Sequence, residues 1–552
     1  MNKNKKTIAR KLKTAHAVGA VGGVVMAMAA LPAAAISIDT GNPDLAVRWD
    51  NTLKYNIGWR MEERDNTLGD TAGFSTSTYS RDKNDVVTNR VDILSEFDFI
   101  YKEDHGFRVS AAGWNDFDYE DDVRVNPDLA RLGVTSPYPN NKFTNEVERY
   151  NKRSGEILDA FVFTKLDLGP VPVNFRVGRH NVYWGESLFT FSDSIAYGQG
   201  PLDLRKGTAT PGIEVKELFL PQNQLSAAAQ LTDKISMAAN YYLEWDPHRF
   251  PDGGTYLGGS DVTLLGGQNL GGLPYVGDVD GGRNKTPDDK GSFGVNAQIQ
   301  SDTLGGNLGL YYRKFDDRMP NVAFDAASGV LYNDYAEDVK LYGLSFSRLV
   351  GSVSVSGEVS RREDTALAGN ARGDTWHALV NAIAYIGKTP VFDSAPLTAE
   401  LTYVNLDDVS DETRAQFDSV HEDRGCTLGT KGGCVSDDAW GMNVAFTPTW
   451  FQVFPGIDLT MPINYSLGLK GNSPAALGVA EDAGAWSVGL GLDIYSQYKV
   501  NLTYSDYFGE GVTGPNAFAG APGIGDSQLV AFSGSETLND RGWLSLTLKS
   551  TF

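Results

Sequence analysis

The chain of 552 residues contains only two cysteines and six histidines, and after residue 35 it has no long apolar run. A membrane-spanning helix needs about 18 to 20 consecutive apolar residues, so no later segment predicts one. The histidines, at positions 16, 105, 180, 248, 377 and 421, lack the spacing of metal ligands, and no phosphate-binding or dinucleotide motif follows a strand. The sequence therefore predicts no enzyme, no catalytic residue, no cofactor and no metal site.

Positive charge is also scarce. Of 48 basic residues, six lie in the first 35 positions, which contain no acid, so the remainder has 42 basic and 70 acidic residues and a formal charge of −28. A surface this acidic repels nucleic acid, and a nucleic-acid partner is not expected. The acidic residues either keep the loops soluble or attract divalent cations, and the run NDFDYEDD at 115–122 is a candidate for cation-bridged contact with lipopolysaccharide.

Residues 1–35 have the order of a secretory signal peptide. A basic stretch from Lys3 to Lys13 precedes an apolar run from Ala17 to Leu31, and Ala33-Ala34-Ala35 has the small residues of a cleavage site. The alternative, a membrane anchor, is disfavoured because the apolar run is short and rich in Ala and Gly. The mature chain is therefore expected to be residues 36–552, one domain in an exported protein.

The two cysteines, Cys426 and Cys434, lie close together in the stretch CTLGTKGGC. An exported chain meets an oxidising compartment, which favours a local disulfide that stabilises the folded state by about 2.5 kcal/mol in the chain-entropy model. A metal site is the weaker alternative, because only His421 lies nearby.

Apolar and polar residues alternate over long stretches. In AWSVGLGLDI the residues Trp486, Val488 and Leu490 share one face, whereas Ser487 and Gly489 share the other. Such a period of two predicts a strand with one apolar and one wet face. Strands of soluble sandwiches have about five or six residues, whereas these runs approach the 9–11 residues of a membrane-spanning barrel strand.

The alternation predicts an all-β, transmembrane antiparallel β-barrel of about 18 strands. The strands are expected near 45–60, 88–101, 105–119, 155–166, 171–184, 222–232, 234–245, 293–303, 305–315, 336–350, 352–363, 376–389, 397–408, 437–452, 457–472, 483–495, 497–509 and 541–552. Short and long connections alternate strictly in this assignment, as in bacterial outer-membrane barrels. A sixteen-strand barrel stays open, because 155–166 is apolar on both faces and 376–389 barely alternates.

The end of the chain, GWLSLTLKSTF, has the same alternation and finishes on an aromatic residue. Leu544, Leu546 and Leu548 share the face of the terminal Phe552. In a closed barrel the last strand must pair with the first to remove both edges. The terminal phenylalanine resembles the signal by which the barrel-assembly machinery recognises outer-membrane proteins.

The connection at 185–221 is unusually apolar for an exposed loop, and Pro221 prevents the following strand from starting earlier. An eighteen-strand barrel is hollow, so we expect this connection to fold into the lumen as a constriction or plug. The alternative is a loop packed over the barrel mouth. In either case a set of mostly charged residues is expected to line or gate a path: Trp184, Glu186, Arg205, Lys206, Glu214, Lys216 and Glu217.

The stretches GRHNVYWGES and DLRKGTATPGIEVKELFLPQNQ carry a resemblance to a known family. With the terminal barrel signal, they resemble a domain-of-unknown-function family of outer-membrane β-barrels from Gram-negative proteobacteria. Members are typically encoded beside inner-membrane exporters of the resistance-nodulation-division type and a periplasmic partner. The resemblance implies movement of hydrophobic or amphipathic molecules across the envelope and assigns no catalytic residues.

Together these observations predict a conduit in the outer membrane of a Gram-negative cell. The expected cargo is a hydrophobic or amphipathic compound, and the expected partners are outer-membrane lipid and lipopolysaccharide, the barrel-assembly machinery and an exporter complex. The alternative is a substrate-specific porin for small polar solutes, which an open lumen lined by complementary charges would favour.

Overall fold

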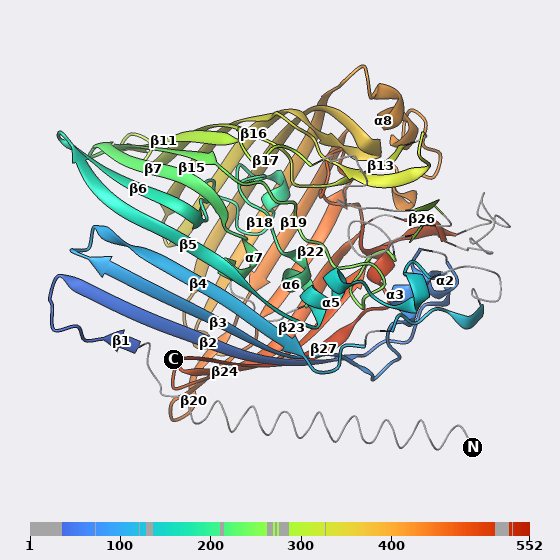
Figure 1. The fold of residues 1–552 in the computed structure, drawn as a ribbon, viewed down its shortest axis with the longest axis horizontal. Coiled ribbons are helices and arrows are strands. Elements are labelled where there is room, and N and C mark those ends of the chain that lie inside the picture. Colours follow the sequence, from blue (N-terminus) through green and yellow to red (C-terminus); the bar gives the residue numbers. More distant parts are fainter. Residues whose placement is uncertain are drawn as a thin grey trace.

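The computed structural model describes residues 36–71, 73–120, 122–128, 136–209, 215–261, 269–270, 273–274, 286–325, 327–513, 529–532 and 534–552. The signal peptide predicted for residues 1–35 lies outside this range. Long, tilted strands form one closed wall, with short turns at one end and long loops with small helices at the other (Figure 1). Among the described residues, no helix is long and apolar enough to cross a membrane.

Eighteen antiparallel barrel strands form the wall, in chain order around the ring. Their segments are β2 (Leu45–Arg60), β3 (Val86–Tyr101), β4 (His105–Asp116), β5 (Arg153–Leu168), β6 (Val171–His180), β7 (Gln222–Thr232), β8 (Ile235–Tyr242), β11 (Phe293–Ser301), β12 (Gly306–Phe315), β15 (Val339–Val350), β16 (Val353–Leu367), β17 (Ala371–Ile386), β18 (Ala395–Val409), β19 (Asp438–Phe446) with β20 (Thr449–Phe454), β21 (Ile457–Thr460) with β22 (Ile463–Lys470), β23 (Gly484–Ile494), β24 (Tyr498–Phe508) and β27 (Trp543–Thr551).

Two of the barrel strands are interrupted at prolines. Pro448 separates β19 from β20, and Pro462 separates β21 from β22, because proline has no N–H to donate to the ladder. The interruption is bridged where the N–H of Met461 donates to the carbonyl of Pro448 at 2.9 Å. A further short segment, β1 (Ile36–Ile38), pairs with β2 beyond the end of β27. The predicted count of eighteen is confirmed, and the two weakly alternating segments both form strands.

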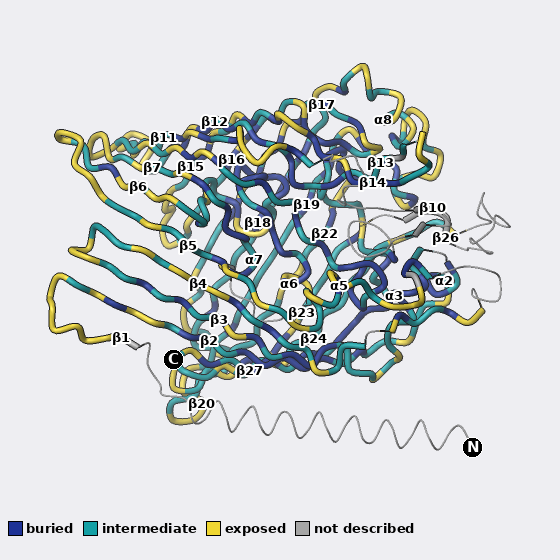
Figure 2. Tube along the Cα trace, viewed as in Figure 1, coloured by how far each residue is buried: buried dark blue, intermediate teal, exposed yellow. Residues whose placement is uncertain are grey.

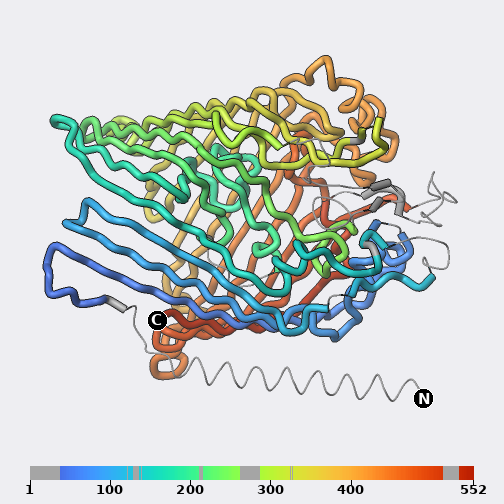
Figure 3. Tube along the Cα trace, viewed as in Figure 1, coloured from blue at the N-terminus to red at the C-terminus, as the bar shows by residue number. Residues whose placement is uncertain are grey.

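The last strand closes the ring against the first. β27 pairs with β24 on one side and with β2 on the other, from Thr52 opposite Thr551 to Arg60 opposite Trp543. The terminal Phe552 continues the ladder, because its N–H and carbonyl both bond to the backbone of Asn51 at 2.8 Å. Figure 3 shows the blue first strand beside the red last strand. Closure leaves the wall without a free edge, as a bilayer requires.

The outer face of the wall is apolar and the inner face is polar. Exposed and buried positions alternate along the strands (Figure 2), and the exposed ones carry large apolar side chains. They include Ile93, Phe107, Val162, Val177, Leu225, Met237, Val295, Leu310, Leu344, Val380, Leu490 and Leu502. An apolar outside and a polar inside are typical of a membrane barrel.

The strict alternation of short and long connections is wrong at one place. Residues 364–375 were expected to be a long loop, but β16 and β17 both extend beyond the wall and are joined by Ala368–Asn370 alone. The projecting hairpin is held by an apolar cluster in which Leu367 and Ala371 pack against Phe417 of α8 (Arg414–Val420). The sequence also gave no sign of the hairpin β13 (Asn321–Asp325) and β14 (Val330–Asp334) between β12 and β15.

The predicted disulfide is confirmed. Cys426 and Cys434 are bonded, with their Cα atoms 5.7 Å apart, in the loop that also contains α8. The amide of Asn472 donates to the carbonyl of Cys434 at 2.8 Å and so ties this loop to the connection between β22 and β23. The disulfide therefore shapes the long-loop end of the barrel.

Candidate functional site

Charged side chains face the interior of the barrel on β16 and β17. On β16, Glu358 and Arg362 are 4% and 1% exposed, whereas the intervening Val359 is 44% exposed. On β17, His377 is 1% exposed and its neighbour Trp376 is 42% exposed. A buried charge needs hydrogen-bonding partners, so these side chains must be satisfied from within the lumen.

The partners come from the connection between β6 and β7, residues 181–221, which we call the lumen loop. Its described part contains η2 (Phe191–Asp193), α6 (Leu204–Ala209) and α7 (Val215–Leu218), and in Figure 1 the helices lie within the ring of strands. The chain turns at Gly185 and Gly198, whose φ angles of 112° and 71° lie in the region that favours glycine.

Two wall carboxylates hold the first half of the lumen loop. Glu400 on β18 accepts hydrogen bonds from the N–H groups of residues 188–190 at 2.7, 3.2 and 2.7 Å. Glu358 on β16 accepts from the N–H groups of Glu186 and Ile195, both at 2.8 Å. Backbone N–H donors to a carboxylate make charge-assisted bonds, which are stronger than neutral ones. We call these two residues the carboxylate cradle.

Two wall arginines satisfy the carbonyls of the same segment. Arg362 donates to the carbonyls of Ser192 and Ser194 at 2.6 and 3.0 Å, and Arg313 on β12 donates to that of Tyr197 at 2.5 Å. Residues 186–197 have little regular structure of their own, so their backbone groups depend on wall side chains for partners.

Several apolar side chains of the lumen loop pack against the wall, whereas Leu188 and Phe189 are 41% and 39% exposed. Ile195 lies against Gly343 on β15, where an added Cβ would be 2.8 Å from its side chain, and Trp184 lies against Gly294 on β11, where the distance would be 2.7 Å. The wall glycines therefore provide the space for the loop. The buried cluster comprises Ile195, Tyr197, Tyr311, Phe315, Ala336, Val339, Leu341 and Ala366, with Trp184 and Phe191 packed against it.

The second half of the lumen loop attaches to the opposite side of the barrel. Its ion pairs are Lys206 with Glu156 of β5 at 2.5 Å, Lys216 with Glu96 of β3, and Glu217 with Lys54 of β2 at 3.7 Å. In the ring of eighteen strands, β3 and β16 are nine strands apart and so face each other. The lumen loop therefore crosses the full width of the barrel.

The lumen loop is also tied to the long connection between β8 and β11. Arg249 pairs with Glu156 at 2.8 Å and with Asp203 at 3.2 Å. The N–H of Leu202 donates to Nδ1 of His248 at 3.0 Å, so this nitrogen carries no proton. Burial beside Arg318 lowers the pKa of His248 to about 3.

A prediction follows for the acid stability of this contact. The imidazole of the unfolded chain binds a proton near pH 6.5, whereas the native pKa is lowered to about 3. The unfolded state therefore binds more protons between these values, and the contribution of His248 to the free energy of unfolding falls as the pH falls through this window. We expect His248→Asn, which keeps an acceptor but does not titrate, to lose less stability than wild type between pH 7 and pH 4. Thermal melts of wild type and His248→Asn at pH 7 and pH 4 measure the difference. Equal losses of stability would contradict the lowered pKa of His248.

Six of the seven predicted site residues lie in the described part of the lumen loop, and four of them form ion pairs. Trp184 and Glu186 lie against β11 and β15, and Glu186 interacts with Ser345 at 3.4 Å. Arg205 lies 3.5 Å from Asp252, and the pairs of Lys206, Lys216 and Glu217 are those given above. Glu214 lies outside the described residues. The lining or gating role of all seven stays a prediction.

The wall partners of the loop were missed from the sequence. Glu358 and Arg362 lie in the stretch EVSRRED, in which acidic and basic residues occupy both faces of the strand. The charges on the polar face of an otherwise alternating strand were the available signal. Without a structure, their partners in the lumen loop could not be named.

A row of lysines crosses the inner wall near the short-turn end. Lys54 on β2 is directly opposite Lys549 on β27, which in turn is opposite Lys499 on β24. Like charges in opposite positions destabilise a sheet, although Glu217 lies 3.7 Å from Lys54 and Asp493 lies 4.0 Å from Lys499. We call these three residues the lysine row.

The side of the lumen formed by β22, β23 and β24 is lined by small polar residues. Ser487, Gly489 and Gly491 alternate with apolar outward residues on β23, and Asn501 and Thr503 do so on β24. The hydrogen bonds and ion pairs of the lumen loop given above join it to β2, β3, β5, β12, β15, β16 and β18. No group of three or more His, Cys, Asp or Glu side chains in the described ranges could hold a metal ion.

The fold and the site together define a class, a transmembrane β-barrel of eighteen strands whose interior is crossed by a loop bound to both sides of the wall. The chain belongs to the DUF1302 family, described as a protein of unknown function, whose sequence profile matches residues 16–552. The family resemblance noted from the sequence is thereby confirmed. Comparison with curated protein sequences finds no match.

Several solved structures are similar in fold at low sequence identity. OpdK from Pseudomonas aeruginosa, solved with vanillate, is 9% identical with a TM-score of 0.40, over 92% of this chain and 98% of that one. OccAB4 from Acinetobacter baumannii is 10% identical with a TM-score of 0.42, over the same shares. OccD3 (OpdP) from Pseudomonas aeruginosa is 12% identical with a TM-score of 0.39, over 94% of this chain and 93% of that one.

Proposed function

We propose that this protein is a selective channel of the outer membrane for small polar solutes. The observation that carries the proposal is that the inner faces of β22 to β24 present serine, threonine, asparagine and glycine, while Ile195 and Tyr197 of the lumen loop are buried against the wall. Solutes that pass such surfaces exchange hydrogen bonds with water for hydrogen bonds with the wall.

The conduit for a hydrophobic compound is less well supported. It was predicted because residues 185–221 are apolar, and an apolar loop in a lumen would suit an apolar cargo. The packing of Ile195, Tyr197 and Trp184 against the wall explains part of that composition without any cargo, although Leu188 and Phe189 are left exposed. Partnership with an inner-membrane exporter stays a prediction.

The outer-membrane location belongs to the same proposal. The apolar outside of the wall fits a bilayer, and the ladder between Phe552 and Asn51 fits a terminal strand that seals the barrel. Export through the predicted signal peptide and recognition by the barrel-assembly machinery would deliver the chain there. Outer-membrane lipid and lipopolysaccharide would then surround it.

Swelling of proteoliposomes in small polar solutes tests the channel. We expect swelling with small amino acids and pentoses and none with a trisaccharide, because a loop across the lumen narrows the path. Lipid vesicles without protein are the control. Uptake of an apolar dye without uptake of any polar solute would overturn the proposal and restore the hydrophobic conduit.

The lysine row predicts a preference for anions. Fixed positive charges in a narrow path raise the local concentration of anions and repel cations. We expect Lys499→Glu to lower the anion-to-cation permeability ratio by about threefold or more, measured as the shift in reversal potential across a salt gradient. Lys234→Glu, in the exposed turn between β7 and β8, is the matched control and should leave the potential unchanged. Equal shifts in both variants would contradict a role for the row.

A further inference from the structure

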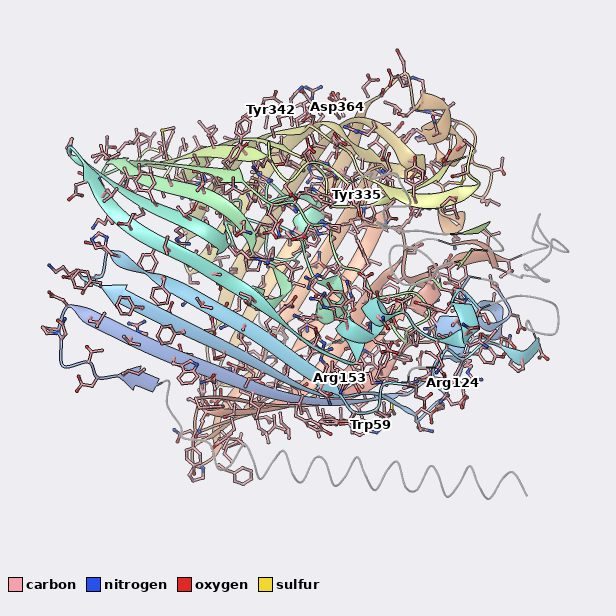
Figure 4. All side chains as sticks on the ribbon, viewed as in Figure 1. Trp59, Arg124, Arg153, Tyr335, Tyr342 and Asp364 are labelled. Atoms are coloured by element: carbon pink, nitrogen blue, oxygen red, sulfur yellow. A yellow bond between two sulfur atoms is a disulfide. The ribbon has the colours of Figure 1, made fainter. Side chains whose placement is uncertain are left out.

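A cavity of about 100 Å³ lies at the long-loop end of the barrel, between the lumen loop and the loops above it. Its walls come from β3, from the ends of β4 and β27, from the connections 61–85, 117–152 and 243–261, and from α6 of the lumen loop. Figure 4 shows Arg124, one of its lining residues, beyond the strands among the long loops. A solute arriving from that side would meet this cavity before the lumen loop.

Arginines from four separate segments line the cavity: Arg81, Arg90, Arg124 and Arg205. Arg205 is the most informative, because its side chain is only 7% exposed and its Nε has no hydrogen-bond partner. Its guanidinium lies over the ring of Tyr150 at 3.8 Å, and its Nη1 is 3.5 Å from Asp252. A buried donor without an acceptor is costly, so a ligand acceptor at this point would be favourable.

The positive charge of Arg81 is also poorly neutralised. Its guanidinium donates to three backbone carbonyls, those of Val86, Ser80 and Asp118, at 3.0 to 3.2 Å. The carboxylate of Glu120 lies 3.7 Å away. Carbonyl oxygens satisfy the hydrogens but carry no full charge, and Glu120 is shared between Arg81 and Arg124.

The carboxylates of the cavity are already occupied. Asp116 accepts from the hydroxyl of Thr88 at 2.9 Å and from the N–H of Asp118 at 2.9 Å. Glu120 is bound by Arg124 through two nitrogens, with contacts of 2.9 to 3.2 Å. Asp122, the third lining carboxylate, accepts from Lys142 at 2.9 Å. An incoming cation would therefore find its acceptors engaged, whereas an incoming anion finds the Nε donor of Arg205.

The remaining walls are aromatic and apolar. Tyr119, Phe143, Tyr256 and Trp543 line the cavity together with Val87 and Leu257. Aromatic rings bind a flat apolar body by stacking and edge contacts, and arginine binds carboxylate in a planar, two-pronged geometry. The two kinds of lining thus suit the two ends of one small molecule.

We propose that this cavity is a binding site for a small carboxylate that carries a flat apolar ring, and that it loads the solute onto the lumen loop through Arg205. The proposal rests on the proposed channel function and deepens it by naming a solute class. Arg205 belongs to α6 of the lumen loop itself, so the bound anion touches the element that crosses the lumen.

Isothermal titration calorimetry of the detergent-solubilised full-length barrel with benzoate tests the site. We expect saturable binding by wild type and binding about tenfold weaker in Arg205→Gln, because a hydrogen bond to a charged group contributes on that scale. Arg153→Gln, on β5 and outside the cavity lining, is the matched control and should bind as wild type does. Acetate tests the need for the ring and benzyl alcohol tests the need for the charge.

Absence of benzoate binding by wild type, or equal binding by wild type and Arg205→Gln, would overturn the site. Acetate or benzyl alcohol binding as tightly as benzoate would overturn the assigned solute class. Arg124→Gln, in the connection between β4 and β5, replaces Arg205→Gln if the latter fails to give a folded barrel, and the same weakening is expected. A barrel that conducts without binding benzoate leaves the channel intact, and one that binds benzoate without conducting leaves the site intact.

Discussion

Replacing residues 188–220 by a short Gly-Ser linker should convert a narrow, low-conductance barrel into a wide pore. The lumen loop is bound to β16 and β18 on one side and to β2, β3 and β5 on the other, so its removal empties the middle of the ring. A wall of eighteen strands without an inserted segment encloses an aqueous channel. We expect single-channel conductance in a planar bilayer to rise on the order of tenfold.

The control for this deletion is a second shortened loop. Replacing residues 321–334, the hairpin of β13 and β14, by the same linker removes residues from the long-loop end without touching the lumen loop's contacts with the wall. That variant should conduct as wild type does. Large, steady openings of the wild-type barrel, unchanged by the deletion of 188–220, would mean that the loop does not obstruct the lumen.

Removing the carboxylate cradle should release the first half of the lumen loop without unfolding the barrel. Glu358→Ala with Glu400→Ala leaves five backbone N–H groups of residues 186–195 without their acceptors. Each unsatisfied buried N–H costs about 1–3 kcal/mol, which exceeds the packing of a short segment. The segment is therefore expected to detach into water, giving flickering currents between the wild-type and loop-deleted levels.

Two further variants distinguish release of the lumen loop from a non-specific effect of the substitutions on the barrel. Glu363→Ala, also on β16 but partly exposed, should change neither the current nor the resistance of the loop to protease. Glu358→Gln with Glu400→Gln keeps an acceptor oxygen at each position. Its current and its protease resistance should lie between those of wild type and those of the double alanine variant. Wild-type traces and wild-type protease resistance in the double alanine variant would show that other contacts suffice to hold the loop.

The wall of the barrel could be predicted from the sequence because its signal is local. Alternation with period two is visible within each strand, and turn residues mark most of the ends. The same argument failed at 364–375, where β16 and β17 continue as strands in place of the expected loop. Their extension depends on Phe417, which is about fifty residues further along the chain and has no influence on the local pattern.

The site could be predicted only in outline. The apolar character of 185–221 and its charged residues drew attention to the right segment, and Lys206, Lys216 and Glu217 do pair with the wall. The apolar content was taken as a property of the cargo, and for Ile195 and Trp184 it is accounted for by packing against Gly343 and Gly294. No local pattern joins positions more than 200 residues apart, as Leu188 and Glu400 are.

The double attachment of the lumen loop has a consequence for how the barrel is made. The loop is bonded to β2, β3 and β5 from the first third of the chain and to β16, β17 and β18 from the last half. The ring is sealed only when β27, the last strand to be synthesised, pairs with β2. Contacts between residues far apart in the sequence form slowly, because the chain loses conformational entropy on closing before the pairing lowers its free energy. We therefore expect a loop that binds early and late strands alike to bring them together before β27 pairs with β2, so the segment that crosses the lumen would also guide the assembly of the wall.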